Sequence, residues 1–123
     1  EGIGRPRVEA SFLPSVIDAM CKVPDALSLA AMHYLARRLG RRVGGSSGTN
    51  LIGALLVAQR MVAAGESGSV VAILCAGGER YADSYSDQTW LSAQGFALAP
   101  PIAQIAACAE QGAALPELPL SGL

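Results

Sequence analysis

The feature that most constrains this chain is the glycine- and serine-rich turn at residues 44–48, GGSSG. The short run RRV precedes it, and after it the apolar residues of TNLIGALLVAQRMVAAG recur at helical spacing as far as Gly65. A strand edge followed by the N-terminus of a helix is where open α/β sheets bind their ligands. Ser46, in the middle of the turn, is therefore a candidate for a ligand contact.

The segments on either side of the turn predict an α/β fold. Residues 16–23 partly alternate and stop at Pro24, which favours a short strand, and Asp25 can cap the helix that follows, which Gly40 closes. Residues 41–45 indicate a second strand, 48–65 a second helix, and the continuous apolar run 69–75 a third strand. The order β-α-β-α-β with right-handed crossovers predicts a partial parallel sheet with flanking helices.

Length and composition agree with a single compact unit. The chain has 123 residues, enough for one domain, and hydrophobic residues make up 51% of it although aromatic residues make up only 5%. Small aliphatic side chains let helices pack closely on a sheet. We expect a loop at residues 1–15, the α/β portion at 16–95, and a tail at 96–123 with a short helix near 102–111 and a poorly ordered last dozen residues.

Charge and hydropathy argue against two classes of partner. The net charge is −1, and basic residues do not alternate with aromatic ones, so we expect no nucleic acid. Among the clustered arginines, Arg37 and Arg38 fall in the last turn of a predicted helix, where cations offset the helix dipole, and phosphate binding is the alternative. The longest apolar run, 51–58, is far too short to span a membrane.

The three cysteines are odd in number and widely spaced. They form no Cys-x-x-Cys pair, which argues against both a disulfide framework and a metal site, and which indicates a reducing, cytoplasmic location. The sequence opens with Glu1 and has no secretory leader, so we expect it to be a piece of a longer polypeptide.

Two alternatives to a ligand contact exist for this turn: Ser46 is the nucleophile of a hydrolase, or the turn has only a structural role. Gly44-Gly45-Ser46-Ser47-Gly48 matches the Gly-x-Ser-x-Gly turn of α/β-hydrolases, but the histidine of that fold follows the serine in the chain. The only histidine here, His33, precedes it, so a serine hydrolase would lack its base. In the purely structural alternative, Ser47 caps the helix and the glycines permit the turn.

Three motifs in order resemble one enzyme family. They are EGIG at residues 1–4, GGSSGTN at 44–50 and GGERYADSYSDQTWL at 77–91. Together, over roughly residues 1–95, they are similar to the C-terminal part of the cysteine synthase and cystathionine β-synthase family. These are enzymes dependent on pyridoxal phosphate, with the tryptophan-synthase-β-like fold called fold type II.

The resemblance implies a cofactor site and an activity. In the family, the first serine of the Gly-x-Ser-Ser/Ala-Gly turn hydrogen-bonds the pyridine nitrogen of pyridoxal phosphate, and by position this residue is Ser46, preceded by Gly45. Gly2 and Gly4 would line the cofactor and the substrate, and Cys75 would end a strand near the ring, although a cysteine there is also an ordinary small core residue. The implied chemistry is β-elimination or β-replacement on cysteine- or serine-like amino acids.

Other parts of such a site are missing from the sequence. Its single lysine, Lys22, lies outside any family lysine motif, and neither a phosphate-binding glycine loop nor a substrate-carboxylate loop is present. The resemblance therefore implies that this chain is the C-terminal part of an enzyme, inactive by itself and completed by the N-terminal part, in a homodimer. The alternative is a non-catalytic interaction or regulatory module of the same fold.

Overall fold

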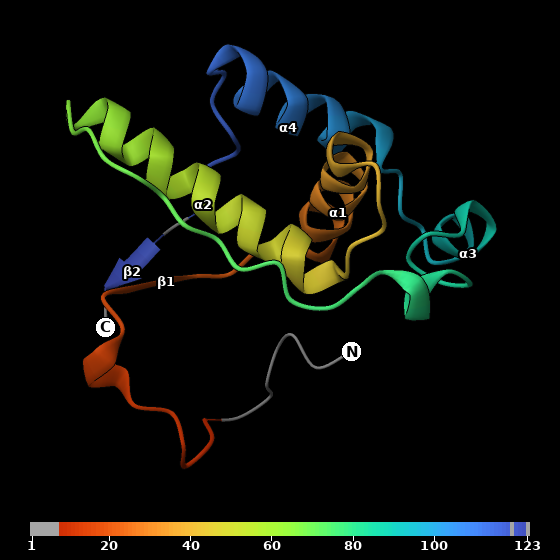
Figure 1. The fold of residues 1–123 in the computed structure, drawn as a ribbon, viewed down its shortest axis with the longest axis horizontal. Coiled ribbons are helices and arrows are strands. Elements are labelled where there is room, and N and C mark those ends of the chain that lie inside the picture. The colour runs from red at the N-terminus through yellow and green to blue at the C-terminus, as the bar shows by residue number, and fades with distance from the viewer. Residues whose placement is uncertain (1–7, 119, 123) are drawn as a thin grey trace.

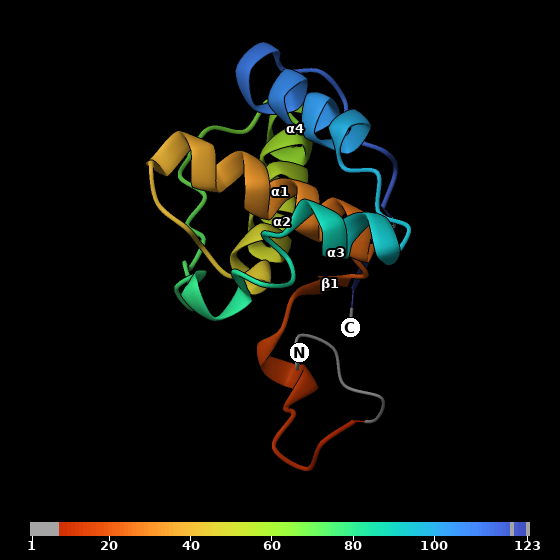
Figure 2. The same cartoon turned by 90° about the vertical axis from the view of Figure 1, so that its right-hand side faces the viewer.

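The computed structural model describes residues 8–118 and 120–122 (Figures 1 and 2). The α-helices of this part are α1 (Asp25–Leu39), α2 (Gly45–Ala63), α3 (Gln88–Ala93) and α4 (Ala99–Gln111). The strands are β1 (Ala19–Cys21) and β2 (Leu120–Gly122), and Pro14–Val16 and Glu79–Tyr81 form short 3-10 helices.

The bounds of α1 follow from local sequence signals. The helix begins after Pro24, whose extended backbone cannot continue a helix backwards, and Asp25 is its first residue and not its cap. It ends at Gly40, as predicted, because the left-handed conformation there (φ 65°) costs glycine little. The Gly40 amide donates to the Ala36 carbonyl oxygen.

Helix α1 is the centre of the fold, since it packs on both α2 and α4 (Figure 2). Ala30 and Ala31 are fully buried, and small side chains allow helices to approach one another closely. The buried core also contains Leu27, Leu29, Ile52, Leu56, Leu91, Leu98, Ile105, Cys108 and Leu115. Burial raises the pKa of the Cys108 thiol in α4.

The contact between α1 and α2 is tightest at Gly48. A β-carbon at this position would collide with the Ser28 carbonyl oxygen and lie 2.7 Å from the Met32 amide nitrogen, both in α1. The next residue, Thr49, donates a hydrogen bond from its hydroxyl to that of Ser28 at 2.9 Å. The glycine therefore fixes how closely the first turn of α2 approaches α1.

The predicted parallel sheet does not form in the part of the chain that the structure describes. There the sheet consists of β1 and β2, which are antiparallel, with Met20 opposite Ser121. Residues 41–45 contribute only an isolated antiparallel bridge between Val43 and Gly77. Residues 69–75 are assigned to no strand and run back alongside α2 (Figure 1).

The reason lies in how strands are defined. A strand exists only where its backbone groups pair with a neighbouring segment, and an apolar run specifies no neighbour. Residues 69–75 meet no such partner among residues 8–118 and 120–122, and only one residue of 41–45 forms a bridge.

Four further features differ from the sequence-based expectation. Helix α2 begins at Gly45 instead of residue 48, and α4 begins at Ala99 instead of 102, with prolines in its first turn where no amide donor is needed. Helix α3 was not expected; Asp87 caps it, accepting a hydrogen bond from the Trp90 amide. The tail, expected to be poorly ordered at its end, contributes β2.

None of the helices within the described residues is both long enough and apolar enough to cross a bilayer. The same residues contain no cluster of three or more histidine, cysteine, aspartate or glutamate side chains that could hold a metal ion.

We predict that Gly48→Ala destabilises the protein by about 1–3 kcal/mol, because the added methyl group must push α2 away from the α1 backbone. Gly53→Ala is the matched control in the same helix. A β-carbon there has no neighbour within 4 Å, so we expect it to stabilise the helix by about 0.5–1 kcal/mol. Urea denaturation measures both, and equal effects of the two substitutions would contradict the assigned packing.

Candidate functional site

The turn at residues 44–48 forms the N-terminus of α2. Gly44 is the cap residue, with extended backbone, and no side chain caps the helix. Gly45, Ser46 and Ser47 occupy the first helical turn. The structural alternative in which Ser47 caps the helix is therefore wrong, since this serine lies inside the helix.

Ser47 connects α2 to residues 73–75. Its side chain is buried, with 1% of the residue exposed, and its hydroxyl oxygen accepts a hydrogen bond from the Cys75 amide at 3.1 Å. Three residues further along the helix, the Asn50 side-chain amide donates to the Ile73 carbonyl oxygen at 2.9 Å. Residues three apart share one face of a helix, so this face of α2 holds the end of the extended segment.

The residues that follow Cys75 pack against the other side of the turn. The Gly44 amide donates to the Ala76 carbonyl oxygen at 2.9 Å, next to the bridge between Val43 and Gly77. Gly78 is buried so tightly on Val43 that a β-carbon would lie 2.6 Å from the Val43 carbonyl oxygen. Tyr81 is buried beside Gly44, where a β-carbon would lie 3.3 Å from its ring.

Ser46 differs from its neighbours. It is half-buried, and its side chain makes no hydrogen bond to any described residue. The residues beside it, Gly45 and Ser47, are buried. The turn thus holds one neutral hydroxyl group that can donate to or accept from a ligand.

Of the other predicted site residues, Cys75 lies next to the turn. Cys75 is exposed, and its amide is bound to Ser47, so the structure brings it next to the residue that follows Ser46. This contact does not lie at the edge of a parallel sheet, because no such sheet forms among the described residues. Gly2 and Gly4 lie outside the described residues.

His33 does not supply a base for Ser46. Its Nε2 atom donates to the Tyr85 carbonyl oxygen at 2.7 Å, which holds the ring toward the segment before α3. Within the described part of the chain it makes no hydrogen bond with Ser46. The structure thus gives the serine hydrolase interpretation no catalytic pair.

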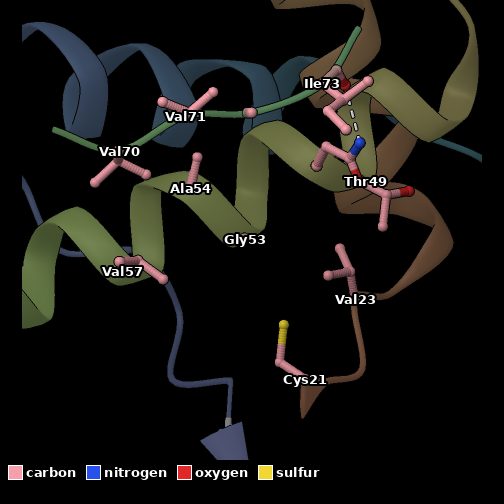
Figure 3. A pocket seen from close by; sticks show the side chains of 11 residues that line it. Cys21, Val23, Thr49, Gly53, Ala54, Val57, Val70, Val71 and Ile73 are labelled. Carbon is pink, nitrogen blue, oxygen red and sulfur yellow. Dashed lines mark hydrogen bonds between the residues drawn. The ribbon is translucent and has the colours of Figure 1, made fainter. Parts of the chain in front are cut away.

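An open groove of about 430 Å³ lies beside the site (Figure 3). The middle of α2, including Ala54 and Val57, lies between its two other walls, which are residues 70–73 of the extended segment on one side and Cys21 and Val23 on the other. Val71 and Ile73 are 89% and 71% exposed. Apolar residues are therefore exposed along the segment whose end is bound to the Ser46 turn.

Comparison with known proteins supports the resemblance. The chain is 56% identical over 105 residues to the L-cysteine desulfhydrase Cds1 of Mycobacterium tuberculosis, an alignment that covers 85% of the chain and 28% of that protein. It is 31% identical over 103 residues to cysteine synthase 1 of Emericella nidulans (82% and 27%). It is 35% identical over 96 residues to the cystathionine beta-synthase of Apis mellifera (78% and 18%).

The chain is homologous to the cysteine synthase and cystathionine β-synthase family. It spans less than a third of the length of each of these family members, 28% at most. No protein-family model matches the chain, and no solved structure matches it.

Sequence reasoning missed the role of Ser47 in this family's turn. The signal was present in the three-residue spacing of Ser47 and Asn50, which puts two hydrogen-bonding side chains on one face of the helix. Only the start of α2 at Gly45 shows that this face is turned toward residues 73–75.

We predict that Gly78→Ala disturbs the turn, because its methyl group would strike the Val43 backbone. The expected result is a loss of about 1–3 kcal/mol in stability and faster hydrogen exchange at the Gly44 amide, whose bond to Ala76 adjoins this contact. Gly77→Ala is the control, since its β-carbon would meet only the movable carboxylate of Glu79. Unchanged exchange at Gly44 in Gly78→Ala would refute the assigned contact.

Proposed function

We propose that this chain is the C-terminal part of a pyridoxal-phosphate-dependent enzyme that carries out β-elimination or β-replacement on cysteine- or serine-like amino acids. The observation that carries the proposal is the 56% identity to an L-cysteine desulfhydrase over 85% of the chain. The identities to a cysteine synthase and a cystathionine beta-synthase support the broader reaction class.

The Ser46 hydroxyl fits a contact with the pyridine nitrogen of the cofactor. That nitrogen needs one hydrogen-bond partner, and Ser46 has a neutral, half-buried hydroxyl with no bond to a described residue. Pyridoxal phosphate, when bound, supplies an electron-withdrawing ring that makes the α-proton of an amino acid acidic and allows its β-substituent to leave. A hydroxyl, unlike a carboxylate, does not hold the ring nitrogen protonated, which favours β-chemistry over transamination.

The neighbouring residues would shape the space around this contact. Gly45 is buried and lacks a side chain, so it leaves room beside the hydroxyl. Cys75 is fastened to the same turn through its amide, so we propose that it borders the cofactor site. Gly2 and Gly4 remain predicted cofactor-lining residues.

The remaining groups would come from the N-terminal part of the same enzyme. Lys22 is exposed and follows β1, in a sequence context unlike that of a Schiff-base lysine, so we propose that the catalytic lysine and the phosphate-binding loop lie in the N-terminal part. We also propose that the N-terminal part packs over residues 69–75, because exposed apolar residues on an unpaired extended backbone are typical of an interface.

Two further proposals follow the resemblance and the cysteine pattern. The complete enzyme is a homodimer in the cytoplasm. The three cysteines, Cys21, Cys75 and Cys108, are free thiols in the structure, which suits a reducing compartment.

Ser46 variants of the complete enzyme test the proposed function. Ser46→Ala should weaken cofactor binding by about 0.5–1.5 kcal/mol and lower turnover without abolishing it, because one neutral hydrogen bond is lost. Ser46→Asp should hold the ring nitrogen protonated and divert the reaction toward side products. Cofactor titration by absorbance and product analysis with cysteine measure these effects.

The matched control for these variants is Ser67→Ala, at an exposed serine in the loop after α2. We expect it to bind the cofactor as the unmodified enzyme does. Unchanged cofactor affinity, turnover and product ratio in both Ser46 variants would remove the assignment. A complete polypeptide without a lysine-bearing N-terminal part would favour the non-catalytic module instead.

Burial of residues 69–75 by the N-terminal part can be tested separately. In the isolated 123-residue chain, Val71→Asp and Val62→Asp should change the melting temperature little, because both valines are exposed, by 89% and 78%. In the complete enzyme Val71→Asp should lower it strongly, because a buried unpaired carboxylate is costly, whereas Val62→Asp should not. Calorimetry compares the four variants with the two unmodified proteins, and equal effects of the two substitutions in the complete enzyme would contradict the proposed interface.

A further inference from the structure

We propose that Ser47 is a positioning residue, which sets the direction of the Ser46 hydroxyl toward the cofactor and couples the extended segment to the site. The proposal rests on the function proposed above. Ser47 itself would touch neither substrate nor cofactor, because its buried hydroxyl is directed at the Cys75 amide at 3.1 Å.

Ser47 is the one residue of the turn whose side chain can orient Ser46. Of residues 44–48, three are glycines, and only Ser46 and Ser47 carry side chains. Because an α-helix turns about 100° per residue, adjacent serines project in different directions from the same short piece of backbone. A hydrogen bond that fixes Ser47 therefore also fixes the direction in which Ser46 projects.

Contacts on two sides keep the turn from adjusting freely. Gly48 is pressed against the Ser28 carbonyl oxygen of α1, which prevents movement in that direction. On the other side, the Gly44 amide is bonded to the Ala76 carbonyl oxygen at 2.9 Å. Within the first turn of α2, Ser47 is the residue whose side chain is hydrogen-bonded to another described segment, through the Cys75 amide, so this bond sets the rotation of the turn. Thr49, which bonds the Ser28 hydroxyl, follows this turn.

A second connection in the same region provides a comparison. Asn50 also holds the extended segment, through the Ile73 carbonyl oxygen at 2.9 Å and the Cys75 sulfur at 3.4 Å, but it lies about one helical turn beyond Ser47. If Ser47 acts by aiming Ser46, loss of Ser47 should affect the cofactor much more than loss of Asn50. If both serve only to hold the segment, the two losses should have similar effects.

A double-mutant cycle in the complete, cofactor-loaded enzyme tests the proposal. The variants are Ser46→Ala, Ser47→Ala, the double variant and Asn50→Ala, and the readout is the affinity for pyridoxal phosphate by equilibrium dialysis. We expect Ser47→Ala to weaken binding by about two- to tenfold, the size of one hydrogen bond. The double variant should bind no more weakly than Ser46→Ala alone, since a missing hydroxyl cannot be misdirected. Asn50→Ala should stay within about twofold of the unmodified enzyme.

Two further measurements separate positioning from general stability. The emission spectrum of the bound cofactor should change alike in Ser46→Ala and Ser47→Ala, a change that a loss of stability alone does not produce. Ser47→Cys keeps the shape of the side chain with a larger atom that is a weaker acceptor, and should bind the cofactor with intermediate affinity. It replaces Ser47→Ala in the cycle if that variant does not fold.

Each outcome decides one of the two proposals. Additive losses in the double variant, or an Asn50→Ala effect as large as that of Ser47→Ala, would overturn the positioning role while leaving Ser46 as a cofactor contact. If Ser46→Ala alone leaves cofactor affinity unchanged, the proposed contact of Ser46 is wrong, and the positioning role is wrong with it.

Discussion

The close approach of α2 to α1 at Gly48 is the contact on which the rest of the structure depends. Without a β-carbon, the first turn of α2 reaches the Ser28 carbonyl oxygen, and Thr49 adds a hydrogen bond to the Ser28 hydroxyl. Because α1 is also the helix on which α4 packs, this contact ties the glycine turn to the most buried part of the molecule. The contact therefore fixes the position of the first turn of α2.

On its other side, the turn is held by backbone contacts with residues 76–78. Ala76 accepts from the Gly44 amide, and Gly78 lies directly on Val43, so neither side of the turn has room to shift. The two serines between these contacts are then used differently. Ser47 faces inward and binds the Cys75 amide, whereas the Ser46 hydroxyl stays half-buried and unbonded to any described residue. A rigid turn with one available neutral hydroxyl suits recognition of a planar ring nitrogen.

The extended segment links the site to the proposed interface. Residues 69–75 have the composition of a buried strand, yet Val71 and Ile73 are largely exposed and the segment is paired with no strand among the described residues. Its end is bonded to the Ser46 turn. Since the chain covers at most 28% of the relatives compared with it, we propose that the same contact which buries this segment also brings the rest of the site to Ser46.

The sequence by itself determined what local chemistry and motif order can determine. Pro24 and Gly40 gave the bounds of α1, helical periodicity located α2, and three motifs in order indicated the family to which the comparisons show homology. Only the tertiary structure decided which segments pair and which serine faces inward. Periodicity describes one segment at a time, whereas pairing is a relation between distant segments, and for that reason it could not show that no parallel sheet forms among the described residues. The roles of Ser46 and Ser47 depend on α2 starting at Gly45, because a three-residue shift in the helix start decides whether a serine caps the helix or lies inside it.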